Sequence, residues 1–161
     1  MQSQGALGWI EQSALAEAMR TGLWTYPIVE IVHIVGFVLL VGSVAMFDLR
    51  LLGLGKALSV QALGRHLLRW TLLSLVLVVP AGLLMFSAHP SDFLGNPVFL
   101  LKLVLILLAG LNALLFHARV YRGAAEWDVG AEPPAAAKSH ALVSLFTWIA
   151  VISCGRLLAY T

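Results

Sequence analysis

The stretch NPVFLLKLVLILLAGLNALLFHARVYR, from Asn96 to Arg122, decides the fold. Its apolar part is long enough to cross a lipid bilayer, which requires about 20 residues at 1.5 Å per residue. Lys102 interrupts this part near its start and His117 lies near its end. An ionisable residue near the middle of a membrane costs about 2.5–3.5 kcal/mol. Each of these two side chains is therefore expected to have a function or a partner.

The composition indicates that lipid is the solvent. The chain has 161 residues, of which 60% are hydrophobic and 11% charged, too few charges to cover a soluble domain. Apolar spans are predicted at about residues 24–50, 66–89, 97–121 and 139–160, without the alternating pattern of a membrane β-barrel. The predicted fold is an all-α, integral membrane four-helix bundle that forms one domain over residues 1–161. Such a chain fits a bilayer and not a nucleic-acid partner.

The segment before the first span predicts a short helix at the membrane interface. Within residues 5–20, apolar side chains recur at helical spacing opposite Glu17 and Arg20. The segment has neither the basic start nor the continuous apolar centre of a signal peptide. It is therefore expected to lie on the membrane rather than to be a cleaved leader.

The distribution of basic residues predicts the orientation. Four spans place both termini on one side, and basic loops usually remain in the cytoplasm. Seven basic residues lie on the side of the loops and three on the side of the termini: Arg50, Lys56, Arg65, Arg69, Arg119, Arg122 and Lys138 against Arg20, Lys102 and Arg156. Both termini are therefore predicted to be periplasmic, in a bacterial inner membrane.

Polar residues of the first and third spans are predicted to share one layer. Glu30 and His33 are three residues apart and share a helix face. Gly36 continues that face, where its small size lets another helix or a flat ligand approach. Counted at 1.5 Å per residue, His33 lies roughly 10 Å and Lys102 roughly 8 Å below the outer surface.

A second group of imidazoles is predicted in the inner half. His117 lies near the end of the third span, while His66 and His140 begin the second and fourth spans. Imidazoles on several helices at matched heights are what a four-helix bundle uses to hold a haem by axial ligation.

Structural alternatives remain open for the individual residues. His33 could hydrogen-bond Glu30 or a carbonyl, and Lys102 could pair with Glu30 or extend to the interface. His66 and His140 suit a basic interfacial surface. Arg156 could extend outward, neutralise Glu30 or bind a haem propionate.

Several motifs resemble those of known families. YPIVEIVHIVGFVLLVG, DLRLLGLG, EWD and GRLLAY are similar to a family of small, uncharacterised bacterial four-span proteins. More distantly, the chain resembles the HemJ-type protoporphyrinogen oxidases, four-helix membrane proteins that bind haem b. The similarity lies in His33 and Gly36 of the first span and in the third-span pattern of Asn96, Pro97, Phe99, Lys102, Leu103 and His117. It implies that His33 and Lys102 bind haem. CopD-type copper proteins have a comparable layout.

Together these features predict a haem b-binding membrane protein, with one or two haems and a redox role. Whether it is an oxidase-like enzyme or an electron carrier stays open, as do a quinone, a porphyrin, a redox protein or a second copy as partner. The candidate metal ligands are His33, Lys102, His117, His66 and His140, with Glu30, Arg156 and Gly36 supporting the cofactor. The alternatives are a copper or small-ion transporter and a cofactor-free structural subunit.

Overall fold

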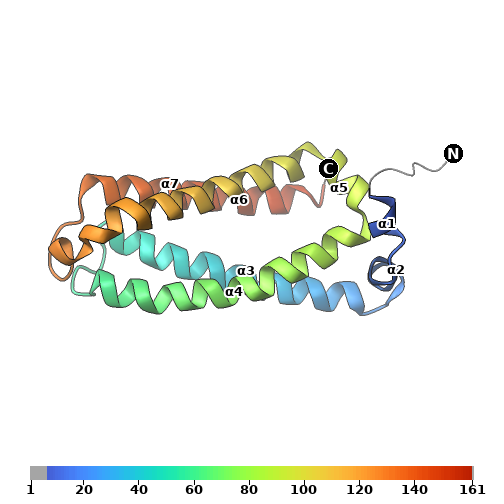
Figure 1. Cartoon of the computed structure of the whole chain (residues 1–161), viewed down its shortest axis with the longest axis horizontal. Helices are drawn as coiled ribbons and strands as arrows, with labels where there is room; N and C mark the ends of the chain where they lie inside the picture. Colours follow the sequence, from blue (N-terminus) through green and yellow to red (C-terminus); the bar gives the residue numbers. More distant parts are fainter. Residues whose placement is uncertain (1–6, 161) are drawn as a thin grey trace.

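A computed structural model describes residues 7–160, and most of them are helical (Figure 1). The elements are α1 (Gly8–Glu11), α2 (Ala14–Thr21), α3 (Thr25–Leu51), α4 (Val60–Ala88), α5 (Pro90–Gly95), α6 (Pro97–Leu115), the π-helix η1 (Phe116–Val120), the 3₁₀-helix η2 (Tyr121–Trp127) and α7 (Ala135–Leu157). No strand occurs in this range, so the predicted all-α bundle is confirmed.

Within residues 7–160, four helical segments are long and apolar enough to cross a membrane: Thr25–Leu51, Val60–Ala88, Pro97–Trp127 and Ala135–Leu157. Between 6% and 22% of the residues in their most apolar windows are buried inside the protein. Most apolar side chains of these windows therefore face outward, as expected where lipid covers them. The chain is a multi-pass membrane protein.

The four long helices form two antiparallel hairpins, α3 with α4 and α6 with α7, which pack together mainly through α3 and α7. Figure 1 shows α1, α2, α5 and the end of α7 at one end of the bundle, here called the terminal end. The opposite end, which holds the loops 52–59 and 128–134, is called the connector end.

Local sequence signals set the helix boundaries. Gly53 and Gly55 lie in the turn that follows α3. Their φ angles of +101° and +64° are in the left-handed region that favours glycine. The Ser59 hydroxyl accepts a hydrogen bond from the Ala62 N–H at 3.0 Å and caps α4. Asn96 caps α6 in the same way, with Pro97 as its first residue.

Several boundaries differ from the sequence prediction, among them the start of α7 at Ala135 rather than at about residue 139. α4 begins six residues earlier than predicted, since the polar first turn after Ser59 is helical although it is not apolar. Beyond the predicted end of the third span, Tyr121–Trp127 forms a 3₁₀-helix. Its side chains Ala124 and Trp127 are buried in the main hydrophobic cluster, which lies at the connector end.

The predicted interfacial helix is two short helices, α1 and α2, within the described part of residues 5–20. They are tied to the protein rather than held by lipid alone. Arg20 donates hydrogen bonds to the carbonyls of Ala88, at 3.0 Å, and Glu11, at 2.7 Å. The Glu11 carboxylate also accepts a hydrogen bond from the Ser91 N–H. The N-terminal segment therefore links α4 and α5 at the terminal end.

Candidate functional site

His33 is half-buried on α3, and its ring is held by α4. Its Nδ1 lies 3.0 Å from the carbonyl oxygen of Val78. Because a carbonyl only accepts, Nδ1 carries the hydrogen in this contact and the neutral ring keeps a lone pair on Nε2. Metal-binding histidines commonly have this arrangement, with one ring nitrogen oriented by a backbone carbonyl and the other free for the metal.

Two glycines bring the helices close enough for this contact. A Cβ added at Gly82 would lie 3.1 Å from Cε1 of His33, so the missing side chain makes room for the ring. A Cβ at Gly36 would lie 2.9 Å from side-chain atoms of both Leu77 and Val78. Of the two roles that the sequence left open for Gly36, the structure shows the close approach of another helix.

Lys102 lies half-buried on α6 and approaches the same layer from the other hairpin. A Cβ added at Gly155 of α7 would lie 3.7 Å from its Nζ. The amine is close enough to interact electrostatically with His33 on α3 and with Cys154 on α7. Among the described residues it makes no hydrogen bond or ion pair, and its alternative ion pair with Glu30 is not formed.

Glu30 and Arg156 flank this pair at the terminal end. Glu30 is exposed and interacts electrostatically with His33 and Tyr26. Arg156 is also exposed; its guanidinium carbon lies 4.7 Å from the centre of the Tyr160 ring and it donates a hydrogen bond to the Tyr160 hydroxyl. Glu30 is thus related to His33, whereas the Arg156 guanidinium contacts Tyr160 near the end of α7.

The other predicted histidines lie elsewhere. His66 is exposed and accepts a hydrogen bond from the Trp70 indole at 3.3 Å. His117 is exposed on η1, with Nδ1 2.9 Å from the Ala113 carbonyl of its own helix. His140 contacts Asn112. Among residues 7–160, no group of three or more histidine, cysteine, aspartate or glutamate side chains could hold a metal ion. Their role as ligands stays a prediction.

A cavity in the connector half of the bundle contains polar residues that were not predicted. It has a volume of about 130 Å³ and is lined by residues of all four long helices, among them Asp48, Asn112 and Ser144, together with the predicted His117 and His140. Asp48 lies directly after an apolar run, in the motif DLR, which is the signal that could have identified it.

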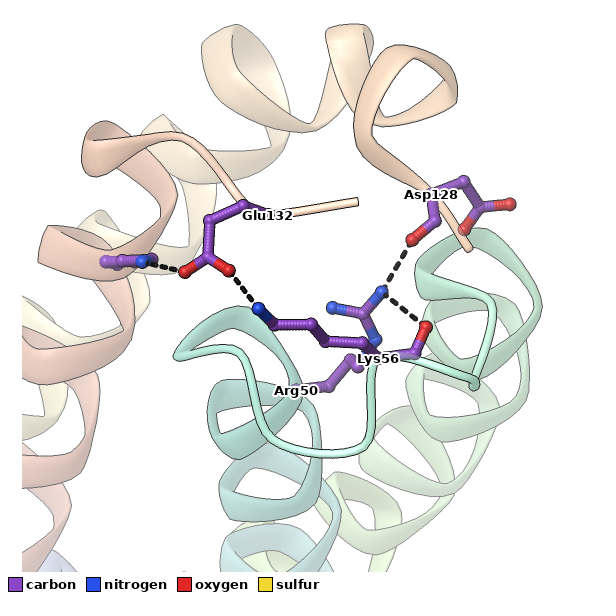
Figure 2. Close-up of polar contacts among 5 residues, drawn as sticks. Arg50, Lys56, Asp128 and Glu132 are labelled. Carbon is purple, nitrogen blue, oxygen red and sulfur yellow. Dashed lines mark hydrogen bonds and ion pairs between the residues drawn. The ribbon is translucent and has the colours of Figure 1, made fainter. Parts of the chain in front are cut away.

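A polar cluster closes the connector end and joins the two hairpins (Figure 2). Arg50 is 1% exposed; its Nε donates to the Leu58 carbonyl at 2.8 Å and one terminal nitrogen to the Asp128 carbonyl at 2.5 Å. Glu132 accepts hydrogen bonds from Lys56 and Lys138. The motifs DLRLLGLG and EWD therefore meet in this cluster, defined as Arg50, Lys56, Asp128, Glu132 and Lys138.

The two carboxylates of this cluster are held in their ionised forms. Desolvation opposes ionisation of Asp128, but hydrogen bonds from the Gln61 and Val60 N–H groups and the Ser59 hydroxyl hold the pKa of Asp128 below its usual value. Hydrogen bonds and charges from Lys138 and Lys56 lower the pKa of Glu132 to about 2. Asp128 thereby stabilises the start of α4, and Glu132 links the loop after α3 to the start of α7.

A family model described as a family of unknown function, DUF6644, matches residues 6–161. The chain belongs to this family. The expected membership of an uncharacterised family is thus confirmed, and the match covers nearly the whole chain. No curated protein and no solved structure matches it, so these comparisons do not support the resemblance to HemJ-type oxidases or CopD-type proteins.

Proposed function

We propose that the chain is a haem b-binding protein with a redox role, in which His33 and Lys102 would hold the haem iron. One observation carries the proposal: an imidazole oriented by a carbonyl and an amine without a hydrogen-bonding partner among the described residues interact across the two hairpins. A neutral imidazole nitrogen and a neutral amine are both suitable donors for haem iron. The donor set therefore fits the group.

The surrounding residues support the same cofactor. Burial disfavours the charged form of an amine, which favours the neutral form that can bind iron. Arg156 lies next to Gly155, which adjoins Lys102, and its exposed guanidinium is suited to a propionate. Haem would supply one-electron chemistry, and the chain would set its potential through the axial ligands and their burial. A quinone, a porphyrin or a partner protein would exchange the electrons.

The other two functions are less well supported by the described residues. A structural network of Glu30, Lys102 and Arg156 would require ion pairs, but Arg156 contacts Tyr160 and Lys102 is unpaired. Copper binding would require more soft or imidazole ligands in one place than the described residues gather.

The proposed location is the bacterial inner membrane with the connector end in the cytoplasm. Arg50 is buried in the polar cluster, but the remaining basic residues of this end still outnumber those of the terminal end. The positive-inside rule therefore places the termini in the periplasm.

The absorption spectrum of the full chain, purified in detergent, tests the proposal. We expect a Soret band that shifts on reduction and a haem content that falls strongly in His33→Ala and Lys102→Ala. Lys102→Arg separates the two roles of this lysine, since arginine keeps the charge but does not ligate iron as a neutral base. It should behave as Lys102→Ala does.

His89→Ala is the matched control, since His89 is an exposed histidine outside the set of candidate ligands, with Nδ1 3.8 Å from the Asp92 carboxylate. It should leave the spectrum unchanged, while size-exclusion chromatography verifies that each variant is folded. A colourless protein from haem-replete cells contradicts the function. An unchanged spectrum in both His33 and Lys102 variants contradicts the ligand assignment.

A further inference from the structure

The connector-half cavity has the dimensions of a ligand site. Its volume of about 130 Å³ is close to that of a cavity of about 150 Å³ that accommodates benzene. Most of its wall is apolar, with the aromatic rings of Phe47 and Phe116 in edge-to-face contact at 5.8 Å. Neither His33 nor Lys102 lines it, so it is distinct from the proposed haem site. A single six-membered ring fits this space.

Asp48 provides a buried carboxylate at the wall of the cavity. It is 5% exposed, and its hydrogen-bond partner is the Ser144 side chain on α7. The second oxygen, Oδ2, is buried and has no hydrogen-bond partner. No basic side chain forms an ion pair with it among the described residues. A buried, unsatisfied acceptor is costly, so a ligand that donates a hydrogen bond to it would be stabilised.

His140 provides a second acceptor, and its contact with Asn112 fixes which nitrogen is free. The Asn112 amide nitrogen donates to the His140 carbonyl at 3.0 Å, which fixes the orientation of the amide. The Asn112 oxygen then accepts from Nδ1 of His140 at 2.7 Å. Nε2 of the neutral ring is left as an acceptor, and both ends of the Asn112 amide are occupied. The cavity thus has one acceptor from α3 and another from α7.

The surroundings favour a neutral donor over a cation. Most of the wall is apolar, and an apolar wall favours a neutral ligand because a cation would lose its hydration there. A bound metal is disfavoured because the described residues gather no group of three ligands. The cavity also lies near the end of α3 and the start of α7, at the depth where amphipathic rings are stable in a membrane.

We propose that the cavity between Asp48 and His140 binds the ring of a hydroquinone, whose two hydroxyls donate to these two acceptors. The inference deepens the redox role proposed above and rests on it for its biological meaning. The binding itself depends only on the cavity, so the two proposals can fail separately.

Ligand-observed NMR on the full chain in detergent tests the proposal, with protein-free micelles as the baseline. The probes are 1,4-hydroquinone under anaerobic, reducing conditions, p-xylene of the same shape without hydroxyls, 1,4-benzoquinone, which only accepts, and benzylammonium as the cation. We expect hydroquinone to bind at least about tenfold more tightly than the other three, because it alone can donate a hydrogen bond to each of the two acceptors. Equal binding of p-xylene or benzoquinone, or tighter binding of benzylammonium, overturns the proposal.

Variants locate the binding. Asp48→Asn should remove most of the preference for hydroquinone, and Ala113→Leu should fill the cavity and abolish binding of every ring. Ser74→Ala is the matched control, since Ser74 is fully buried, hydrogen-bonds Thr71 and does not line the cavity. Hydroquinone binding that survives Ala113→Leu in a folded protein overturns the location.

The outcomes also separate the two proposals. A Soret band without hydroquinone binding overturns this inference and leaves the haem proposal standing. Hydroquinone binding to a colourless protein supports the cavity and overturns the haem proposal. If the cavity binds none of the probes, the inference fails.

Discussion

At the scale of single residues, glycines place the polar groups of the candidate haem site. Gly82 leaves room for the His33 ring, Gly155 for the Lys102 amine, and Gly36 lets α3 approach α4. Each is a position where a methyl group would meet a neighbouring atom or occupy the space beside a polar one. The geometry of the candidate haem site therefore depends on these glycines as well as on His33 and Lys102.

Gly36→Ala is expected to destabilise the protein by about 1–3 kcal/mol, the usual cost of forcing an extra carbon into a packed contact. The added Cβ would lie 2.9 Å from Leu77 and Val78 atoms, and α3 and α4 would have to separate. Gly42→Ala on the same helix is the control, because nothing lies within 4 Å of its added Cβ. Unfolding in a denaturing detergent measures both. Equal stabilities of the two variants would contradict the close packing at Gly36.

The residue scale also shows what the sequence could predict of the site. Counting residues from the membrane surface put His33 and Lys102 at one depth. The cavity could not be derived in this way, since Asp48 and Asn112 become neighbours only when the two hairpins pack side by side. The depth of a residue in the membrane follows from its position in a span. Which residues of two helices face each other depends on how the helices pack, and the sequence does not identify the packing partner.

At the scale of elements, the polar cluster of Figure 2 joins segments that are far apart in the chain. Arg50 at the end of α3 donates to the Asp128 carbonyl, and Asp128 in turn accepts hydrogen bonds from the Ser59 hydroxyl and the Gln61 N–H at the start of α4. The sequence marks the two motifs, but their contact spans 78 positions and is visible only in the structure. Helix lengths and caps can be predicted from neighbouring residues in the sequence, whereas this contact between distant residues cannot.

Arg50→Ala should destabilise the protein by about 3 kcal/mol, because it leaves buried carbonyls without donors. Arg50→Lys keeps the charge without the planar fork of donors and should recover only part of the loss. Thermal unfolding in detergent gives the stabilities. Arg119→Ala, at an exposed position of η1, should change stability by no more than about 0.5 kcal/mol. A variant of Arg50 as stable as this control would show that the cluster contributes nothing.

The ion pairs of Glu132 with Lys56 and Lys138 predict that the stability of the protein depends on pH only under acidic conditions. The pKa of Glu132 falls from an ordinary 4.5 to about 2 in the folded protein. A depressed folded pKa stabilises the protein above the unfolded pKa, and this stabilisation is lost as the pH falls through the folded one. The stability difference between the wild type and Glu132→Gln should be constant above about pH 5 and shrink between pH 4.5 and 2. Urea unfolding across that range measures it, and a constant difference down to pH 2 would contradict the ion pairs.

At the scale of the whole molecule, the apolar runs predicted the number of spans, which the four apolar helices of the described residues match. Long apolar runs can be satisfied in lipid only as helices, and short loops leave few ways to connect them. Composition could not predict how the hairpins meet. Their meeting through α3 and α7, with α6 the least buried of the four, depends on side-chain packing that hydropathy does not encode.

The orientation can be tested with two introduced cysteines in a Cys154→Ser background. Gly95→Cys lies at the terminal end with nothing within 4 Å of its Cβ, and Ala125→Cys is exposed at the connector end. A membrane-impermeant maleimide applied to intact spheroplasts should label position 95, and position 125 only after lysis. The reverse pattern would place the termini in the cytoplasm.

The uneven joining of the two hairpins has a mechanical consequence. The main hydrophobic cluster and the Arg50 cluster fasten them at the connector end, whereas α6 is scarcely buried along its apolar length. The two hairpins are therefore expected to separate more easily at the terminal end than at the connector end, where these contacts join them. A flat molecule could enter or leave beside His33 by elastic flexing, without melting the hydrophobic cluster that keeps the chain folded.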